Sequence, residues 1–517
     1  MLQELVGGKL DLFVSPLRGP VLTGDQAHPM DAPEIAVDET VSGLGLVVRT
    51  LGESQVPCGV VVPRVRLQEG VLVVGARLHV APRAFEHVLV RVDEPSRLRN
   101  SLLVDRVRGH GLILSDRGLG CPCENDPVHV DLLRAATPGC ARRVHLNNAG
   151  AALLSQPTLD AMTGHLRLEA EIGGYEAAGA ARDAIDDTYA AVAELVGGRA
   201  DEIALFDNAT HAWNAAFYSV PLGPGDRILT GRAEYGSNVL AYLQVAQRTG
   251  AEVIVVPNDD YGQLDTVALA DLIDDRTKVI GVTHVPTSGG LVNPAAEVGR
   301  IAREAGALFL LDATQSVGQF PVDVGILGAD MLTGAGRKFL RGPRGTGFLW
   351  IRSEVLERLD PFVAEIRSAT WDGDRGFTWV DGAARFESWE NSYVNLLGLG
   401  AAVRQALDLG LDVIGRRTSM LGGELRDGLD ALPGVRTHDL GEVRCAIVTA
   451  SVDGVPAADV AAHLARSSVN VTTTVPEHTQ FDTEDRGVHP LVRFSPHYYN
   501  TGDELDRAIE SVAAMTR

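Results

Sequence analysis

The chain has 517 residues, 45% of them hydrophobic and 22% charged, which is typical of a soluble globular protein with two or three domains. Its net charge of −22 argues against a nucleic-acid surface, which needs clustered positive charge. We find no signal-peptide pattern, no apolar run approaching the roughly 20 residues that span a bilayer, and five scattered cysteines typical of free thiols, so we expect a cytoplasmic protein that does not enter a membrane.

Residues 1–125 predict a mostly β N-terminal domain. Short runs rich in β-branched residues, such as GVVVPRVRL, GVLVVGARLHV, HVLVRVDEP and GLILSDRG, are separated by Pro and Gly. No motif indicates its role, and a substrate-docking, a partner-binding and a dimer-extending module all fit. Cys121 and Cys123 near His110 lack the second pair of a structural zinc site, so we expect buried thiols and no metal.

Residues 126–142 predict a linker that begins with a helix, DPVHVDLLRAAT. From residue 143 to 405, strand and helix patterns alternate. The strands are RILTG, EVIVVPND, KVIGVTHV, ALFLLDAT, ADMLTG and GTGFLWIR, and the helices include TVALADLI and AAEVGRIAREAG. This alternation predicts a large α/β domain with a mainly parallel sheet. Residues 406–517 predict a smaller α+β lobe, with strands in RCAIVTASV and HPLVRFSPH.

One lysine is a candidate for covalent chemistry. Lysine occurs only as Lys9, Lys278 and Lys338 among 46 Lys plus Arg, and in GAGRKFLRGPRGTG the other cations are arginines, which cannot form an imine. Asp312 ends a buried strand of a parallel sheet, where ligands collect, and Gln315 follows. Pyridoxal 5′-phosphate requires an acid beside its pyridine nitrogen, a donor to its phenolate oxygen and an imine-forming lysine. The alternative for Asp312 is a helix N-cap.

The segment DNATHAWNAAF, residues 207–217, predicts the phosphate site of that cofactor. Backbone amides at the start of a helix bind anions, and the hydroxyl of Thr210 would add a donor. The alternative is that Thr210 only caps the helix.

From about residue 143 to the C-terminus, the sequence resembles the class V aminotransferase family. These fold-type I pyridoxal-phosphate enzymes include cysteine desulfurases, selenocysteine lyases and isopenicillin-N epimerase. LLDATQSVGQFPVDVGILGADMLTGAGRKFLRGPRGTGFL is similar to the family's aspartate-to-lysine block. The resemblance implies a homodimer that acts on an amino acid, with Lys338 forming the imine, Asp312 at the pyridinium nitrogen and Gln315 at the ring oxygen.

The resemblance also implies the other cofactor contacts. Thr210 with Ala209 would hold the phosphate, assisted by Arg337, where many relatives carry His. Tyr235 in RAEYGSN would stack on the ring, and Thr287 in HVPTSGG would lie near the cofactor oxygen. A strand-end aromatic packed in the core is the alternative for Tyr235.

Three residues are implied at the substrate. Arg493 in LVRFSPHYYNTGDELD would bind the α-carboxylate, and its alternative is a pair with a surface acid. Asn148 and Tyr175 fall in segments expected to line the substrate pocket. RFESWENS departs from the RFE-x-G-T pattern of many desulfurases by placing Trp389 and Glu390 where a threonine reaches the neighbouring subunit's phosphate, which puts that contact in doubt.

These features favour a carbon–sulfur lyase. The segment SSVNVTTTVPEHTQFDTEDRGVHP, where a desulfurase needs an acceptor thiol, contains no cysteine, and Cys445 begins a predicted strand. HLNNAGAALLSQPTLDAMTGHLRLEAEIGGYEAA is most similar to the branch with hercynylcysteine sulfoxide lyase. We therefore expect β-elimination of an S-substituted cysteine, or its sulfoxide, to pyruvate, ammonia and a sulfur-containing product in natural-product metabolism. An aminotransferase, a decarboxylative deaminase and an epimerase are alternatives, and a cysteine desulfurase is less favoured. The complete Asp312–Gln315–Lys338 set argues against a purely binding or regulatory role.

Overall fold

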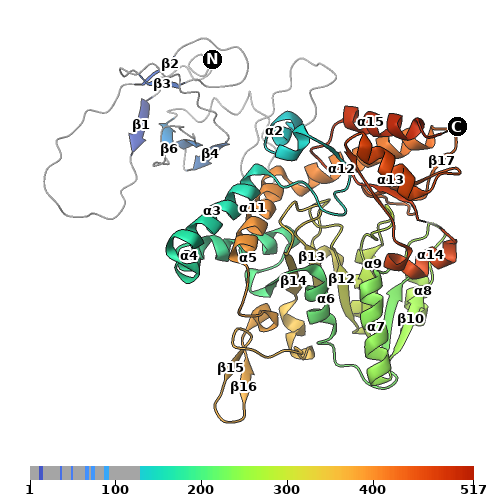
Figure 1. The fold of residues 1–517 in the computed structure, drawn as a ribbon. Coiled ribbons are helices and arrows are strands. Elements are labelled where there is room, and N and C mark those ends of the chain that lie inside the picture. The colour runs from blue at the N-terminus through green and yellow to red at the C-terminus, as the bar shows by residue number, and fades with distance from the viewer. Residues whose placement is uncertain are drawn as a thin grey trace. The chain divides into compact units, whose positions relative to one another are not determined.

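The computed structural model describes residues 129–488 and 490–516 in full, together with six strands nearer the N-terminus. The chain divides into two compact units, Met1–Asn125 and Asp126–Arg517 (Figure 1). The first unit contains an antiparallel sheet in the order β1-β6-β5-β4 and a separate pair, β2–β3. The strands are β1 (Asp11–Ser15), β2 (Ile35–Val37), β3 (Val48–Thr50), β4 (Arg64–Gln68), β5 (Val71–Gly75) and β6 (His87–Arg91). The run GLILSDRG and the residues His110, Cys121 and Cys123 lie outside the described residues.

The second unit is built on a seven-stranded sheet, which confirms the predicted α/β fold with a mainly parallel sheet. β14 runs antiparallel to both of its neighbours, β13 and β8, while the remaining pairs are parallel. In spatial order the strands are β10 (Glu252–Val256), β9 (Arg227–Gly231), β11 (Thr277–Thr283), β12 (Leu308–Asp312), β13 (Met331–Ala335), β14 (Gly347–Ile351) and β8 (Ile203–Phe206). Each predicted strand of this domain is present, and β8 is an addition.

Helices cover both faces of this sheet because its strands are apolar on both sides. In β12, Phe309 and Leu311 pack into the core on one face, whereas Leu308 and Leu310 pack into the core on the other. Successive side chains of a strand point to opposite faces, so one apolar run supplies two cores. The first face is covered by α5 (Arg182–Val196), α9 (Ala295–Ala305) and α11 (Tyr393–Leu409), and the second by α6 (Ala209–Phe217) and α7 (Gly236–Thr249).

Helix α9 shows how the sequence sets these boundaries. It begins after Pro294, buries Val298, Ile301 and Ala302 at helical spacing, and ends at Gly306, whose φ of 71° is left-handed and suits glycine. The remaining helices of this part are α2 (Val130–Ala135), α3 (Gln156–Ile172), α4 (Gly174–Ala180), α8 (Thr266–Leu272) and α10 (Val324–Leu327). A hairpin of β15 (Ala369–Trp371) and β16 (Phe377–Trp379) projects from the unit (Figure 1).

The C-terminal lobe is a second, smaller α+β layer. Its sheet has the order β17-β18-β21-β20, and α12, α13 and α15 pack against it. Its elements are α12 (Leu411–Asp430), β17 (Val435–Thr437), β18 (Val448–Val452), α13 (Ala457–Arg466), β20 (Thr472–Thr473), α14 (Gln480–Arg486), β21 (Val492–Phe494) and α15 (Gly502–Ala513). β7 (Val144–His145) pairs with β19 (Val469–Asn470), and Val144 and Leu146 join the lobe's core. The start of the predicted large domain thus packs in the lobe.

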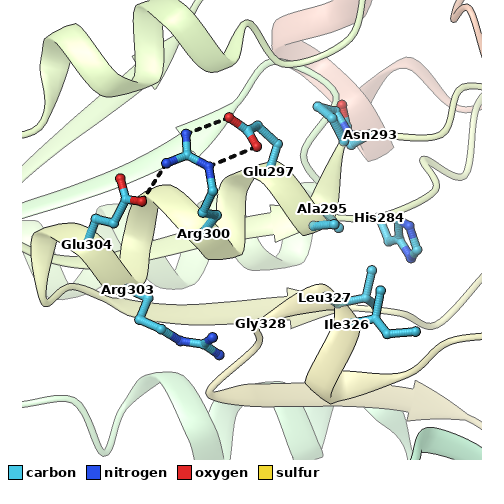
Figure 2. Close-up of a pocket in the computed structure, with 12 residues that line it drawn as sticks. His284, Asn293, Ala295, Glu297, Arg300, Arg303, Glu304, Ile326, Leu327 and Gly328 are labelled. Carbon is cyan, nitrogen blue, oxygen red and sulfur yellow. Dashed lines mark hydrogen bonds and ion pairs between the residues drawn. The ribbon is translucent and has the colours of Figure 1, made fainter.

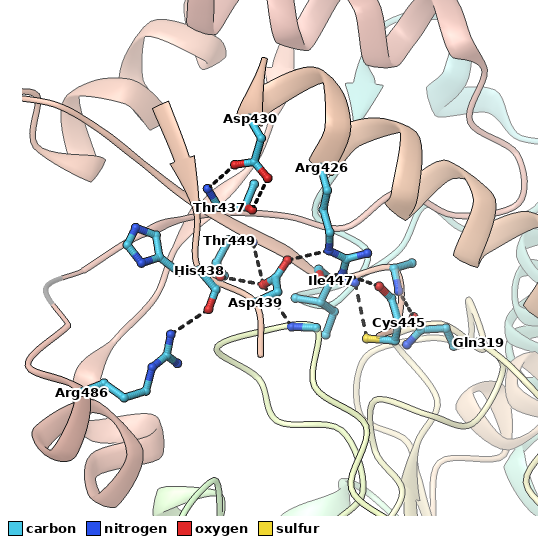
Figure 3. A network of polar contacts seen from close by, with 12 residues as sticks. Gln319, Arg426, Asp430, Thr437, His438, Asp439, Cys445, Ile447, Thr449 and Arg486 are labelled. Carbon is cyan, nitrogen blue, oxygen red and sulfur yellow. Dashed lines mark hydrogen bonds and ion pairs between the residues drawn. The ribbon is translucent and has the colours of Figure 1, made fainter. Parts of the chain in front are cut away.

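A buried polar network ties the lobe to the central domain (Figure 3). The Asp439 carboxylate pairs with Arg426 at 2.8 Å and accepts hydrogen bonds from Gly290 N, Thr449 N and Thr449 Oγ1. Arg426 also donates to the carbonyl oxygens of Cys445 and Ile447. Because Gly290 follows β11, this carboxylate links the loop after β11 to the lobe.

In the part of the chain that the structure describes, no helix is long and apolar enough to cross a membrane.

Candidate active site

A cleft opens where the strands of the central sheet end. β11, β12 and β13 run parallel, and the strand pairing sets Thr283 beside Asp312 and Asp312 beside Thr333. Carboxyl ends of parallel strands meet at one edge of a sheet, so the loops that follow them converge there. The predicted cofactor residues all line this cleft: Ala209, Thr210, Tyr235, Thr287, Asp312, Gln315, Arg337 and Lys338.

Lys338 lies on the turn after β13 and is almost completely buried. Burial, together with the nearby Arg337 and Arg493, lowers the pKa of its ammonium from 10.5 to about 7, while Asp312 opposes this shift. An amine with a pKa near neutrality is unprotonated in a large fraction of molecules under physiological conditions. It can therefore act as a nucleophile towards an aldehyde or as a proton acceptor.

Asp312 is held by a buried network that the sequence did not reveal. Its Oδ1 accepts from Thr314 N at 2.9 Å, and its Oδ2 accepts from Asn238 Nδ2 at 3.2 Å. Asn238 also donates to Glu234 at 2.8 Å, and Thr283 Oγ1 lies 2.5 Å from the same carboxylate. Burial raises the pKa of Glu234 to about 7, although its hydrogen bonds favour the ionised form.

This network fixes the orientation of the Asp312 carboxylate. Glu234 and Asn238 are four residues apart, one before α7 and one in its first turn, and their contacts with Thr283 and Asp312 place both at the sheet edge. That spacing inside RAEYGSN is the signal that would have identified them.

Arg493, on β21 of the lobe, contacts Thr287 of the cleft and is nearly buried. Its Nη1 donates to the carbonyl oxygen and to Oγ1 of Thr287, both at 2.8 Å, and its Nη2 lies 3.3 Å from Asn147 Oδ1. Its Nε has no hydrogen-bond partner, and no carboxylate pairs with it among the described residues. Burial and Arg337 lower its pKa to about 10, so it remains a cation at neutral pH.

The N-terminus of α6 forms another wall of the cleft. Asn208 caps this helix, with its Oδ1 accepting from His211 N at 2.8 Å, so the alternative of Thr210 as the cap is wrong. Arg337 lines the same cleft and donates to the carbonyl oxygen of Gly150, and burial and Arg344 lower its pKa. The cleft thus presents helix amides, a hydroxyl and an arginine together.

Two predicted substrate residues are not brought into the cleft. The side-chain amide of Asn148 is buried and hydrogen-bonded within the protein. It donates to Ser495 O at 2.7 Å and accepts from Tyr499 Oη at 2.5 Å. Its neighbour Asn147 contacts Arg493 instead. Tyr175 lies on α4 and is 80% exposed.

The cleft has the features of a site for a polar ligand. Gln315 Oε1 and Thr314 Oγ1 are buried without a hydrogen-bond partner, although both residues line it. Unpartnered buried polar atoms are costly unless a ligand satisfies them. Within residues 129–488 and 490–516, no group of His, Cys, Asp and Glu could hold a metal ion.

A wider depression between α9 and α10 does not share these features (Figure 2). Arg300 bridges Glu297 and Glu304 there, at 2.6 Å from each. Burial lowers the pKa of His284, at its end, to about 4, and its Nδ1 lies 3.0 Å from Ser316 Oγ. Because Arg300 is already paired with Glu297 and Glu304 and the imidazole of His284 is neutral, this depression offers no evident reactive group. We therefore assign the active site to the cleft around Lys338.

Comparison with known proteins identifies the family. Residues 144–508 match the family Aminotransferase class-V. A cysteine desulfurase from Haloferax volcanii is 29% identical over 422 residues, which cover 76% of this chain and 98% of the relative. The apo structure of a cysteine desulfurase from Thermococcus onnurineus NA1 matches with a TM-score of 0.70 and 26% identity, over 75% of this chain and 98% of that one.

A more distant structure carries a cofactor. It is a variant of C-DES with glycine covalently linked to pyridoxal phosphate, and it matches with a TM-score of 0.66 and 23% identity over 74% of this chain and 98% of that one. That identity shows a shared fold.

These relatives correct the expected reaction. Curated relatives 29% and 31% identical carry the name cysteine desulfurase, which contradicts the expected β-elimination of an S-substituted cysteine. That expectation depended on the lack of a thiol in residues 467–490, but a sulfur acceptor need not belong to the same chain. The fold, the match over residues 144–508 and the converging cleft show that the chain belongs to the class V aminotransferase family, with pyridoxal 5′-phosphate as its cofactor.

Proposed function

We propose that this enzyme is of the cysteine desulfurase type and removes the sulfur atom of L-cysteine, leaving L-alanine. The observation that carries the proposal is that Lys338, an amine with a pKa of about 7, lines the cleft, while Arg493, a buried arginine without a carboxylate partner among the described residues, bonds to Thr287 of the same cleft. An amino acid supplies that carboxylate. The cysteine desulfurases among the relatives favour cysteine as the amino acid.

The cleft residues fit the cofactor. Asp312, oriented by Thr314 N and Asn238, would pair with the pyridine nitrogen, and Gln315, whose Oε1 has no hydrogen-bond partner, would contact the ring hydroxyl oxygen. The amides of Ala209 and Thr210 at the start of α6 would bind the phosphate.

Two further residues that line the cleft would complete the cofactor site. Arg337 would neutralise part of the phosphate charge, and Tyr235 would cover one face of the ring. Bound pyridoxal phosphate withdraws electrons from the α-carbon of an amino acid and so acidifies its proton.

The chain's own groups would perform the remaining tasks. Arg493, held by Thr287 and Asn147, would bind the α-carboxylate and so orient the α-carbon. Lys338, once freed from the cofactor, would accept the α-proton, since a pKa of about 7 leaves a large fraction of the amine unprotonated at neutral pH. Burial of both groups excludes water from the reacting atoms.

The sulfur acceptor would come from outside this unit. Of the cysteines that the structure describes, Cys445 is buried, and burial raises its pKa to about 12. Cys140 lies on a different surface, beside Arg134 and Glu504, and burial raises its pKa as well. Neither is a ready thiolate near Lys338. A thiol from outside Asp126–Arg517 would accept the sulfur.

We also propose a homodimer in the cytoplasm. Large apolar side chains stand exposed on the hairpin and near it: Trp371 is 79% exposed, and Phe377 and Trp389 are each more than half exposed. Exposed aromatic clusters mark interaction surfaces, and a second copy would cover them. Sedimentation equilibrium of the holoenzyme tests this state, and a monomer at all concentrations would exclude it.

Product analysis tests the reaction. Purified holoenzyme would be given L-cysteine with dithiothreitol as the acceptor, and alanine, sulfide, pyruvate and ammonia would be measured. We expect alanine and sulfide in equal amounts, with Lys338→Ala inactive. Pyruvate and ammonia in place of alanine, or no consumption of cysteine, would refute the proposal.

A further inference from the structure

A short segment of the lobe packs beside Tyr235, which lines the cleft. η6 (Pro476–Thr479) follows β20 and packs against α7. The carbonyl oxygen of Glu477 lies so close to Gly236 that a Cβ at position 236 would overlap it. Only glycine allows this approach, which sets the segment directly over the start of α7, next to Tyr235.

This approach brings one imidazole to the mouth of the cleft. The ring of His478 lies 5.9 Å from the ring of Tyr235, which lines the cleft, and the side chain is exposed to solvent. No hydrogen bond occupies the His478 ring in the part of the chain that the structure describes. The imidazole is therefore free to contact a molecule that enters.

The surroundings of His478 lower its pKa and so favour the neutral imidazole. Burial lowers its pKa most, Arg493 and Lys338 lower it further, and Glu477 opposes them. Tyr235 is the other titratable group against it. A neutral imidazole at physiological pH accepts a proton from a thiol.

Charged residues on α14, the helix that follows η6, pair with other side chains and not with His478. Asp482 pairs with Arg486, and Arg486 also donates to the carbonyl oxygen of His438. Asp485 pairs with Arg232.

We propose that His478 is a catalytic residue that transfers the proton of the sulfur acceptor. This inference depends on the proposed desulfurase function. The buried Lys338 would accept the proton of the α-carbon inside the cleft. An external thiol would arrive from solvent, to which His478 is exposed.

The step is balanced in atoms and electrons. His478 takes the proton of the acceptor thiol, and the resulting thiolate attacks the sulfur of bound cysteine. A sulfur–sulfur bond forms, and the Cβ–Sγ bond breaks with its electron pair remaining on Cβ. His478 then returns the proton to Cβ. The net reaction converts one thiol and one cysteine into one persulfide and one alanine, so no additional oxidant or reductant is needed.

The test separates this step from chemistry at the α-carbon. Holoenzyme carrying His478→Ala would be assayed for alanine formed from L-cysteine with dithiothreitol, and for exchange of the α-hydrogen of L-alanine in D₂O, which involves no sulfur. The matched control is His463→Ala, because His463 lies on α13 and contacts Arg466. Melting temperatures would be recorded for all three proteins.

We expect His478→Ala to lower desulfuration by about 10²-fold or more, with α-hydrogen exchange and melting temperature unchanged. Added imidazole should restore part of the lost rate, which it would not do for a structural role. The control should match wild type throughout. Unchanged desulfuration, or an equal loss of exchange, would overturn the inference. Failure of the wild-type enzyme to form alanine would instead refute the proposed function itself.

Discussion

Arg493 offers a quantitative test of substrate binding. Its guanidinium is nearly buried, is fixed by Thr287 and Asn147, and has no carboxylate partner among the described residues. Loss of one partner of a buried charge pair costs about 2–5 kcal/mol. Since every 1.4 kcal/mol is a tenfold change, Arg493→Ala should raise the Kd of an amino acid by about 30-fold to about 4,000-fold.

The assay uses two ligands that differ in the carboxylate. L-Alanine and ethylamine would be titrated into wild-type and Arg493→Ala holoenzyme, with cofactor absorbance as the signal. The variant should weaken L-alanine binding by the stated factor and leave ethylamine unchanged. Arg436→Ala, an exposed arginine on β17 of the same sheet, is the control and should bind both like wild type. Equal weakening of both ligands, or unchanged L-alanine affinity, would remove Arg493 from the carboxylate site.

Three further outcomes follow from the buried charges. Lys338→Ala should abolish both the imine absorbance and turnover, whereas Lys278→Ala, at an exposed site where Lys278 pairs with Asp226, should leave both intact. Because the pKa of Lys338 is lowered to about 7, it loses its proton near neutral pH, so the rate at which apoenzyme takes up cofactor should rise through about pH 7 and then level off; a rate still rising towards pH 10 would contradict this. Asp439→Ala leaves Arg426 buried without its partner and should lower the free energy of unfolding in urea by about 3–5 kcal/mol. Glu194→Ala, which removes an exposed partner of Arg404, should change it by about 1 kcal/mol or less.

Much of the fold follows from local patterns. Apolar runs such as ALFLLDAT are buried on both sides, so their length and flanking polar residues locate the strands without knowledge of their neighbours. β8 was not predicted because IALF is only four residues long and its pairing with β14 depends on a distant segment. The packing of Val144 into the lobe depends on an equally distant strand, β19.

The candidate site was predictable where function demands a particular residue type. Asp312 and Lys338 follow adjacent strands, and only lysine can form an imine, so the sequence places them together. Asn148 and Asn147 are chemically identical, and only the folded backbone shows that Asn147 contacts Arg493 while Asn148 bonds to Ser495. The reaction was predicted wrongly because the missing thiol was taken as evidence against desulfuration.

The imine lysine is the central claim, and one measurement tests it directly. Purified holoenzyme would be reduced with borohydride, digested, and mapped by mass spectrometry for the phosphopyridoxyl group. The account predicts this group on the peptide that contains Lys338, with Lys9 and Lys278 unmodified. A phosphopyridoxyl group on either of those lysines, or none on Lys338 in cofactor-loaded protein, would contradict it.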